Sequence, residues 1–143
     1  MSPFAVALRE LRLLRRLRQS DAAELLGYEQ TYISALEVGT KGPPPEAFVD
    51  RVVRVFELQD LDEKRLRDAH KASHRRVVIP VDAPENVYML VNELRQQIEQ
   101  LHPAQIELIR IALKFPQAIA VESIQSERLR RRTFGKGRRD TEK

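Results

Sequence analysis

Apolar residues recur three or four positions apart through most of the chain, which is the spacing of amphipathic helices. Helix boundaries divide this pattern: Ser2-Pro3 and Pro45-Glu46 are typical helix starts, and Gly27 and Gly39 are typical helix ends. The pattern predicts a bundle of five helices that ends near His74, followed by further helices in the C-terminal half. We therefore expect an all-α fold.

The expected core of the bundle is made of apolar side chains at these helical positions. It consists of Phe4, Leu8, Leu11, Leu17, Ala22, Ala23, Leu25, Leu26, Ile33, Leu36, Phe48, Val49, Val52, Val53, Phe56, Leu66 and Ala69. Arg9 and Arg12 occupy the remaining side of the first helix, and a solvated helix face is the simpler interpretation of them.

Residues 18–39 predict two short helices joined by a tight turn. Gly27 interrupts the apolar spacing, and Ile33 and Leu36 resume it on a second helix, roughly Gln30 to Glu37. The outward face of that helix is left with small, amide and hydroxyl side chains, namely Gln30, Thr31, Ser34 and Ala35. Such side chains can enter a major groove and meet base edges without a charge penalty.

An ordered series of residues extends this motif in both directions. The series comprises Leu8, Leu11, Leu17, Gln19, the block Ala23-Glu24-Leu25-Leu26-Gly27, Tyr32-Ile33-Ser34, Leu36-Glu37, Gly39, the Pro-rich loop Gly42 to Pro45, and Val49, Val52, Val53 and Phe56. With this series, about the first half of the chain resembles the phage Cro/repressor-type (XRE) family of helix-turn-helix transcriptional regulators. The resemblance implies a five-helix, lambda-repressor-like domain over residues 1–76 that binds an inverted-repeat operator in double-stranded DNA as a homodimer, and acts as a repressor.

Two positions depart from the family pattern, which usually has Ser or Thr at the starts of the second and third helices. Arg18 and Glu29 occupy these positions here. Loss of a hydroxyl cap costs about 1 kcal/mol, so it affects local stability rather than the fold. Glu29 would also repel nearby phosphates weakly.

The resemblance and the residue types together suggest roles on DNA. Gln30 is the best candidate for base readout, because its amide can pair with adenine through two hydrogen bonds, and Thr31, Ser34 and Ala35 lie beside it. The expected contacts to the DNA backbone come from Arg18, Gln19, Tyr32, Thr40 and Lys41. The first two lie at a helix start, where free amides favour a phosphate, whereas the loop around the last two could equally be a plain connection.

The C-terminal half predicts a linker or short strand over residues 77–84 and a helical region over 85–127. An apolar seam in this region has the four-and-three spacing of a coiled coil, and consists of Val87, Val91, Leu94, Ile98 and Leu101. A further helix is expected from Pro103, and a last one around residues 119–124. Two heptads are too short to be stable by themselves. These helices therefore form either a hydrophobic core within one chain or, as we favour, a dimerisation module.

The formal net charge of +4 is unevenly distributed along the chain. Residues 128–143 contain eight Lys or Arg and two acidic residues, a net charge of +6, so residues 1–127 sum to −2. This basic tail is expected to be disordered. It would either add non-specific attraction to phosphates or simply increase solubility.

Several function classes are not indicated by the sequence. It has no cysteine, no apolar run long enough to span a bilayer, and no nucleophile-elbow, phosphate-loop or metalloprotease motif. We therefore expect no enzyme and no cofactor, and a cytoplasmic, nucleoid-associated location. His70 and His74 stand four apart, but no third ligand lies beside them and neighbouring arginines would repel a cation, so no metal site is expected.

Two other hypotheses remain open. The apolar seam also suits an antitoxin or adaptor whose C-terminal helices bind a partner protein, with DNA binding used for autoregulation. The basic tail alternatively suits RNA binding, which predicts that its deletion abolishes affinity for nucleic acid.

Overall fold

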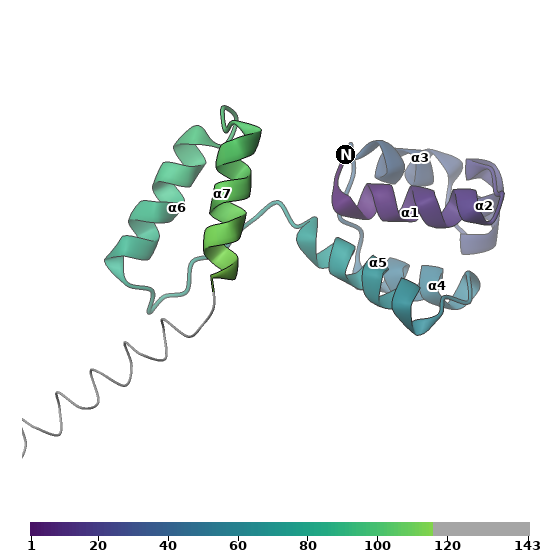
Figure 1. Ribbon diagram of the computed structural model, residues 1–143. Helices are drawn as coiled ribbons and strands as arrows, with labels where there is room; N and C mark the ends of the chain where they lie inside the picture. The colour runs from purple at the N-terminus through teal and green to yellow at the C-terminus, as the bar shows by residue number, and fades with distance from the viewer. Residues whose placement is uncertain (116–143) are drawn as a thin grey trace, which may run out of the picture. The chain divides into compact units, whose positions relative to one another are not determined.

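The computed structural model describes residues 1–115, and the chain divides into two compact units, Met1–Val78 and Ile79–Lys143 (Figure 1). The described residues form seven α-helices and no strand, which confirms the all-α class. The helix expected around residues 119–124 and the basic tail over 128–143 lie outside the described residues.

The first unit contains the five predicted helices. They are α1 (Pro3–Leu14), α2 (Gln19–Leu26), α3 (Gln30–Val38), α4 (Glu46–Val55) and α5 (Asp60–Ala72). The start of α1 is the one expected: the Ser2 hydroxyl accepts a hydrogen bond from the Ala5 amide at 3.2 Å, and Pro3 fills the first helical position.

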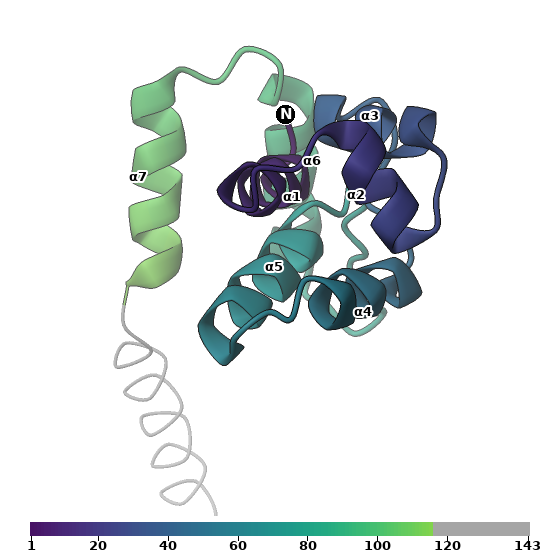
Figure 2. The same ribbon diagram turned by 90° about the vertical axis from the view of Figure 1, so that its right-hand side faces the viewer.

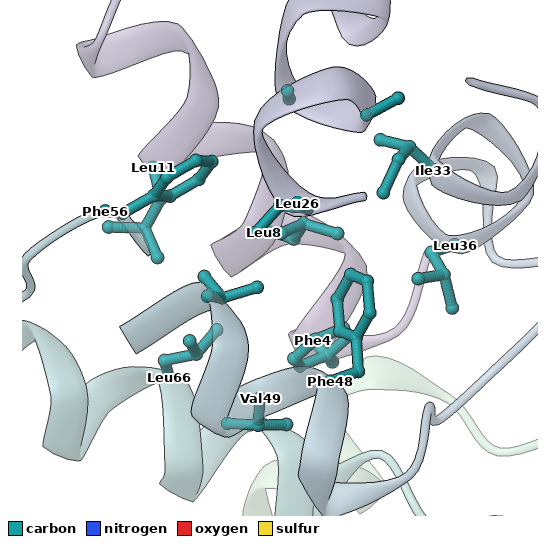
Figure 3. Close-up of a cluster of buried hydrophobic side chains, with 13 residues drawn as sticks. Phe4, Leu8, Leu11, Leu26, Ile33, Leu36, Phe48, Val49, Phe56 and Leu66 are labelled. Atoms are coloured by element: carbon teal, nitrogen blue, oxygen red, sulfur yellow. The ribbon is translucent and has the colours of Figure 1, made fainter. Parts of the chain in front are cut away.

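The core of this unit lies where the five helices converge. Helix α1 packs against both α3 and α5, and α2 packs against α3 and α4 (Figure 2). Figure 3 shows side chains from all five helices pointing into one cluster. The buried members are Phe4, Leu8, Leu11, Ala22, Ala23, Leu26, Ile33, Leu36, Phe48, Val49, Val52, Phe56 and Leu66.

Two expected core residues lie outside the core cluster, whereas Leu17 and Val53 pack against it half-buried. Leu25 is 53% exposed, because the buried arc of α2 runs through Ala22, Ala23 and Leu26 and leaves Leu25 outside it. On α5, Ala69 is only half-buried, and the neighbouring His70 is buried instead. The expectation was wrong for Leu25, since helical spacing alone does not tell which side of a short helix faces its neighbours.

Polar contacts fasten the end of α5 to the rest of the unit. The Phe4 amide donates to the Ser73 hydroxyl at 2.8 Å, which joins the start of α1 to the end of α5. The His70 Nε2 atom lies 2.6 Å from the Pro44 carbonyl oxygen, and the His70 ring meets the Phe4 ring edge-on. The loop that follows α3 is therefore held against a buried side chain.

The second unit contains α6 (Glu85–Gln97) and α7 (Pro103–Lys114). Residues 74–84, which include the segment expected to be a linker or short strand, form neither helix nor strand within one chain. Helix α6 ends at Gln97, earlier than the apolar seam predicted. The Gln100 amide donates to the Gln97 carbonyl in a turn, and Pro103 disfavours helix in the residue before it, so the chain leaves the helix before α7 begins.

Candidate nucleic-acid interface

Two glycines set the limits of α3, the second helix of the helix-turn-helix pair. Gly27 ends α2 with a φ of +72°, and Gly39 ends α3 with a φ of +87°. This left-handed conformation is open to glycine at no steric cost. Only two residues separate Gly27 from α3, so α2 and α3 stay in contact across a tight turn. Glu29 caps α3 with its backbone and makes no side-chain capping bond.

The inward side of α3 anchors the helix. Ile33 and Leu36 are each 1% exposed and lie in the core cluster (Figure 3). Glu37, which follows Ile33 by one helical turn, is also turned inward and is 3% exposed.

The outward side of α3 gathers the four residues expected to read bases. Gln30 and Thr31 are exposed, and Ser34 and Ala35 are half-buried. With Val38 and Thr40, all four line one open hollow of about 500 Å³. The outward arc carries no charged side chain. It presents amide, hydroxyl and apolar groups only, the set that can meet base edges in a major groove.

Of the residues expected to contact the DNA backbone, Arg18 and Gln19 lie at the start of α2. Arg18 is exposed, and its amide donates to the Asp21 carboxylate at 2.8 Å. Gln19 is half-buried, and its Nε2 atom donates to Glu37 at 2.9 Å. The Gln19 side chain therefore links the start of α2 to α3.

Tyr32 is held mainly by its ring. The ring stacks on Tyr28 with centroids 5.3 Å apart and meets Phe48 edge-on at 5.7 Å. Burial, with a smaller contribution from Tyr28, raises the pKa of the Tyr32 hydroxyl, so this group stays protonated at neutral pH. A neutral hydroxyl can donate a hydrogen bond to a phosphate oxygen.

Thr40 and Lys41 fold back over the end of α3. The Thr40 hydroxyl donates to the Ala35 carbonyl at 3.3 Å, and the Lys41 amide donates to the same oxygen at 3.1 Å. The Lys41 ammonium lies 5.2 Å from the centre of the Tyr32 ring. These contacts place a hydroxyl and a cation beside the outward face of α3. Arg75 fastens the same end by donating to the Gly39 carbonyl at 2.8 Å.

The main feature that sequence analysis missed is a buried ion pair beneath this surface. Arg12, expected to lie on a solvated face, is 9% exposed and donates to Glu37 on α3. That expectation was wrong, because α3 crosses α1 at this point and covers Arg12. The signal in the sequence was Glu37 itself, a carboxylate at an inward position, one residue after Leu36.

The surroundings of Glu37 fix its charge. Burial acts to raise the pKa of its carboxyl, but hydrogen bonds from Arg12 and Gln19 and the charges of Arg12 and Arg9 outweigh burial, so the pKa is lowered. The hydrogen bond to Glu37 in turn raises the pKa of Arg12. Arg9 itself is exposed and lines, with Gln19 and Val38, a second hollow of about 350 Å³ beside α3.

None of the seam residues of the second unit is fully buried within one chain. Val87 and Val91 are half-buried on α6, and Leu94 is 38% exposed. Ile98, at the C-terminal cap of α6, is 62% exposed, and Leu101 lies in the turn before α7. Residues 79–115 include no buried side chain, so the described part of this unit has no core of its own.

Among residues 1–115, no group of three or more His, Asp or Glu side chains is placed to hold a metal ion. None of the helices in this range has the length and apolar character needed to cross a bilayer.

Comparison with known proteins agrees with this geometry. Residues 3–67 match the model of a family described as a helix-turn-helix domain. The match begins with α1, includes all of α2, α3 and α4, and reaches into α5. The search of curated proteins and the search of solved structures gave no match. Residues 3–67 are thus similar to a helix-turn-helix domain, and the five-helix fold of the first unit agrees with one, which supports a DNA-binding regulator.

Proposed function

We propose that this chain is a sequence-specific, double-stranded-DNA-binding transcriptional regulator of the phage Cro/repressor type, acting on the nucleoid in the cytoplasm. One observation carries the proposal: the outward face of α3 is open to solvent and uncharged, while Ile33, Leu36 and Glu37 anchor the helix from beneath. A helix presented in this way fits the width of a major groove.

The proposed roles follow from placement and chemistry. Gln30 reads adenine with its amide, Thr31 and Ser34 donate or accept hydrogen bonds at base edges, and Ala35 meets a thymine methyl group. Residues at the rim of this face hold the phosphates on either side. They are Arg18, Gln19, Tyr32, Thr40 and Lys41.

The second unit supports action as a homodimer. Helix α7 exposes apolar side chains on two of its faces, one formed by Ile106, Ile109 and Leu113 and the other by Leu108 and Ile111. Together with the seam on α6, these side chains give the second unit apolar surface that a single chain leaves exposed or half-buried over the described residues. Burial of this surface against a second copy would join two helix-turn-helix domains, as an inverted-repeat operator requires.

Repression is the proposed outcome of binding. A dimer seated across a promoter excludes other proteins from the same grooves without any further chemistry. Nothing beyond DNA occupancy is needed for this effect.

Selection of bound duplexes from a random pool by the full chain tests the proposal. We expect enrichment of an inverted repeat whose half-sites lie one helical turn apart, about 34 Å. A pool that shows no enriched sequence after repeated rounds would rule out sequence-specific binding to double-stranded DNA.

Sedimentation of the full chain separates the dimer from the alternative of an antitoxin or adaptor. A stable dimer supports the regulator. A monomer whose C-terminal helices associate only with a different protein supports the adaptor, because the uncovered apolar surface would then belong to that partner.

A further inference from the structure

The outward face of α3, with Gln30, Thr31, Ser34 and Ala35, is called the reading face below. Val38, the last residue of α3, also lies on this face. It follows Ser34 by four residues and Gln30 by eight, so the three side chains lie in one row along the outward side. Its side chain is 62% exposed and lines the same hollow as Gln30, Thr31 and Ala35. The helix predicted from the sequence ends at Glu37, so Val38 is not among the residues expected to read bases.

Exposure of one apolar side chain is common on protein surfaces and means little alone. Here the exposed valine has a neighbour of the same kind, because Ala35 lies three residues before it on the same arc. The two form a short apolar strip at the C-terminal end of the face, next to the amide and hydroxyl groups of Gln30, Thr31 and Ser34. A strip of methyl groups in this position matches the C5-methyl group of thymine.

The absence of charged side chains on this arc also favours contact with adenine and thymine. Guanine is most often read by Arg or Lys, which donate to its O6 and N7 atoms, and cytosine by an acidic acceptor. None of these residue types lies on the outward arc of α3 itself. The exposed charges at its ends lie off the arc: Glu29 precedes Gln30 as the N-cap, and Arg9 lies on α1, beside Val38. The nearby Lys41 is placed over the Tyr32 ring. The groups that remain suit adenine, through the Gln30 amide, and thymine, through methyl contacts.

We propose that Val38 is a base-reading residue and that this face selects A·T pairs, with adenine paired to Gln30 and thymine methyl groups packed against Ala35 and Val38. The inference rests on the proposed function and adds to it the kind of base pair that each half-site contains. It also adds a specificity-determining residue at the C-terminal end of the recognition helix.

Deoxyuridine provides the test, since it pairs as thymine does but lacks the methyl group. The full chain is measured on its selected duplex and on duplexes in which one thymine of one half-site is replaced by deoxyuridine. At the contacted thymines we expect affinity to fall about fourfold, the effect of losing one buried methyl group. Val38→Ala should bind the thymine duplex more weakly and should lose this fourfold difference at one position.

Leu61→Ala is the matched control, because Leu61 is 61% exposed on α5 and lies outside the reading face. It should keep the full effect of deoxyuridine at every position. Thermal unfolding of Val38→Ala should match that of the wild type, since Val38 is not in the core.

The outcomes separate this inference from the function on which it rests. Tight binding to half-sites with G·C pairs at the contacted positions would overturn the inference and leave sequence-specific DNA binding intact. A Val38→Ala variant that keeps the deoxyuridine effect at every thymine would likewise overturn it. A chain that selects no duplex at all would overturn both.

Discussion

The guanidinium of Arg12 on α1 donates to both carboxylate oxygens of Glu37 on α3, with N–O distances of 2.6 and 2.9 Å. Arg12 also donates to the Leu17 carbonyl at 2.8 Å, and Gln19 on α2 donates to the same carboxylate. Three helices therefore meet at one buried charge directly beneath the reading face. This network fixes the rotation of α3 about its own axis, because a rotated helix would leave the carboxylate buried and unpaired.

Arg12→Ala is expected to destabilise the domain by about 3–5 kcal/mol, because it leaves the Glu37 carboxylate buried without its cation. Chemical denaturation followed by circular dichroism measures the free energy of unfolding. The double variant Arg12→Met with Glu37→Leu should recover much of the loss, since no charge then remains buried. If the double variant were no more stable than Arg12→Ala, the ion pair would not be the cause.

The lowered pKa of Glu37 predicts a loss of stability in acid. Because the folded state binds this proton less readily than the unfolded state, the contribution is complete above the ordinary pKa of 4.5 and is lost as pH falls through the lowered value. The free energy of unfolding, measured from about pH 6 to about pH 3, should fall more steeply for the wild type than for Glu37→Gln.

Asp68 provides a control for this pH dependence. Its pKa is also lowered, by the hydrogen bond and charge of Lys64, but the pair is exposed on α5. Solvent screens such a pair. Asp68→Asn should therefore leave the fall in the free energy of unfolding at acid pH almost unchanged. Equal pH profiles for wild type and Glu37→Gln would show that Glu37 carries none of the effect.

Gly39→Ala is expected to cost about 1–2 kcal/mol, because an L-residue is strained in the left-handed conformation that ends α3. An added Cβ would lie 3.8 Å from its nearest neighbours, so the cost is one of backbone conformation and not of crowding. Gly39→Asn should cost less, since asparagine tolerates this conformation. Thermal unfolding measures both variants, and an alanine variant as stable as the wild type would contradict the prediction.

Gln30→Ala should weaken binding to the selected duplex by about 1–3 kcal/mol and relax selectivity at one base pair of each half-site. Titration of wild type and variant against duplexes changed at each position measures both effects. Gln59→Ala, an exposed glutamine before α5, is the control and should bind as the wild type does. Unchanged affinity and selectivity in Gln30→Ala would remove Gln30 from the readout.

Leu94→Glu should raise the dissociation constant of the proposed dimer by about tenfold or more, since it places a charge in the apolar seam. Sedimentation equilibrium of the full chain measures the change. Met89→Glu is the control, because Met89 is 52% exposed on the opposite side of α6 from the seam. A dimer that tolerates Leu94→Glu as well as Met89→Glu would place the interface elsewhere.

The sequence by itself determined the helices of the first unit and the face that α3 presents. These features depend on local chemistry: helical spacing places Ile33 and Leu36 on one side and Gln30 and Ser34 on the other, and the glycines at 27 and 39 end the helices. For that reason α3, which spans Gln30–Val38, ends within one residue of its predicted bound.

Only the tertiary structure decided what lies beneath that face. Arg12 and Glu37 are 25 residues apart, and their pairing depends on how α1 and α3 cross, which no local spacing encodes. The exposure of Leu25 likewise depends on which neighbours a helix has. A single helix specifies the order of its own faces, whereas the packing of several helices decides which face is buried.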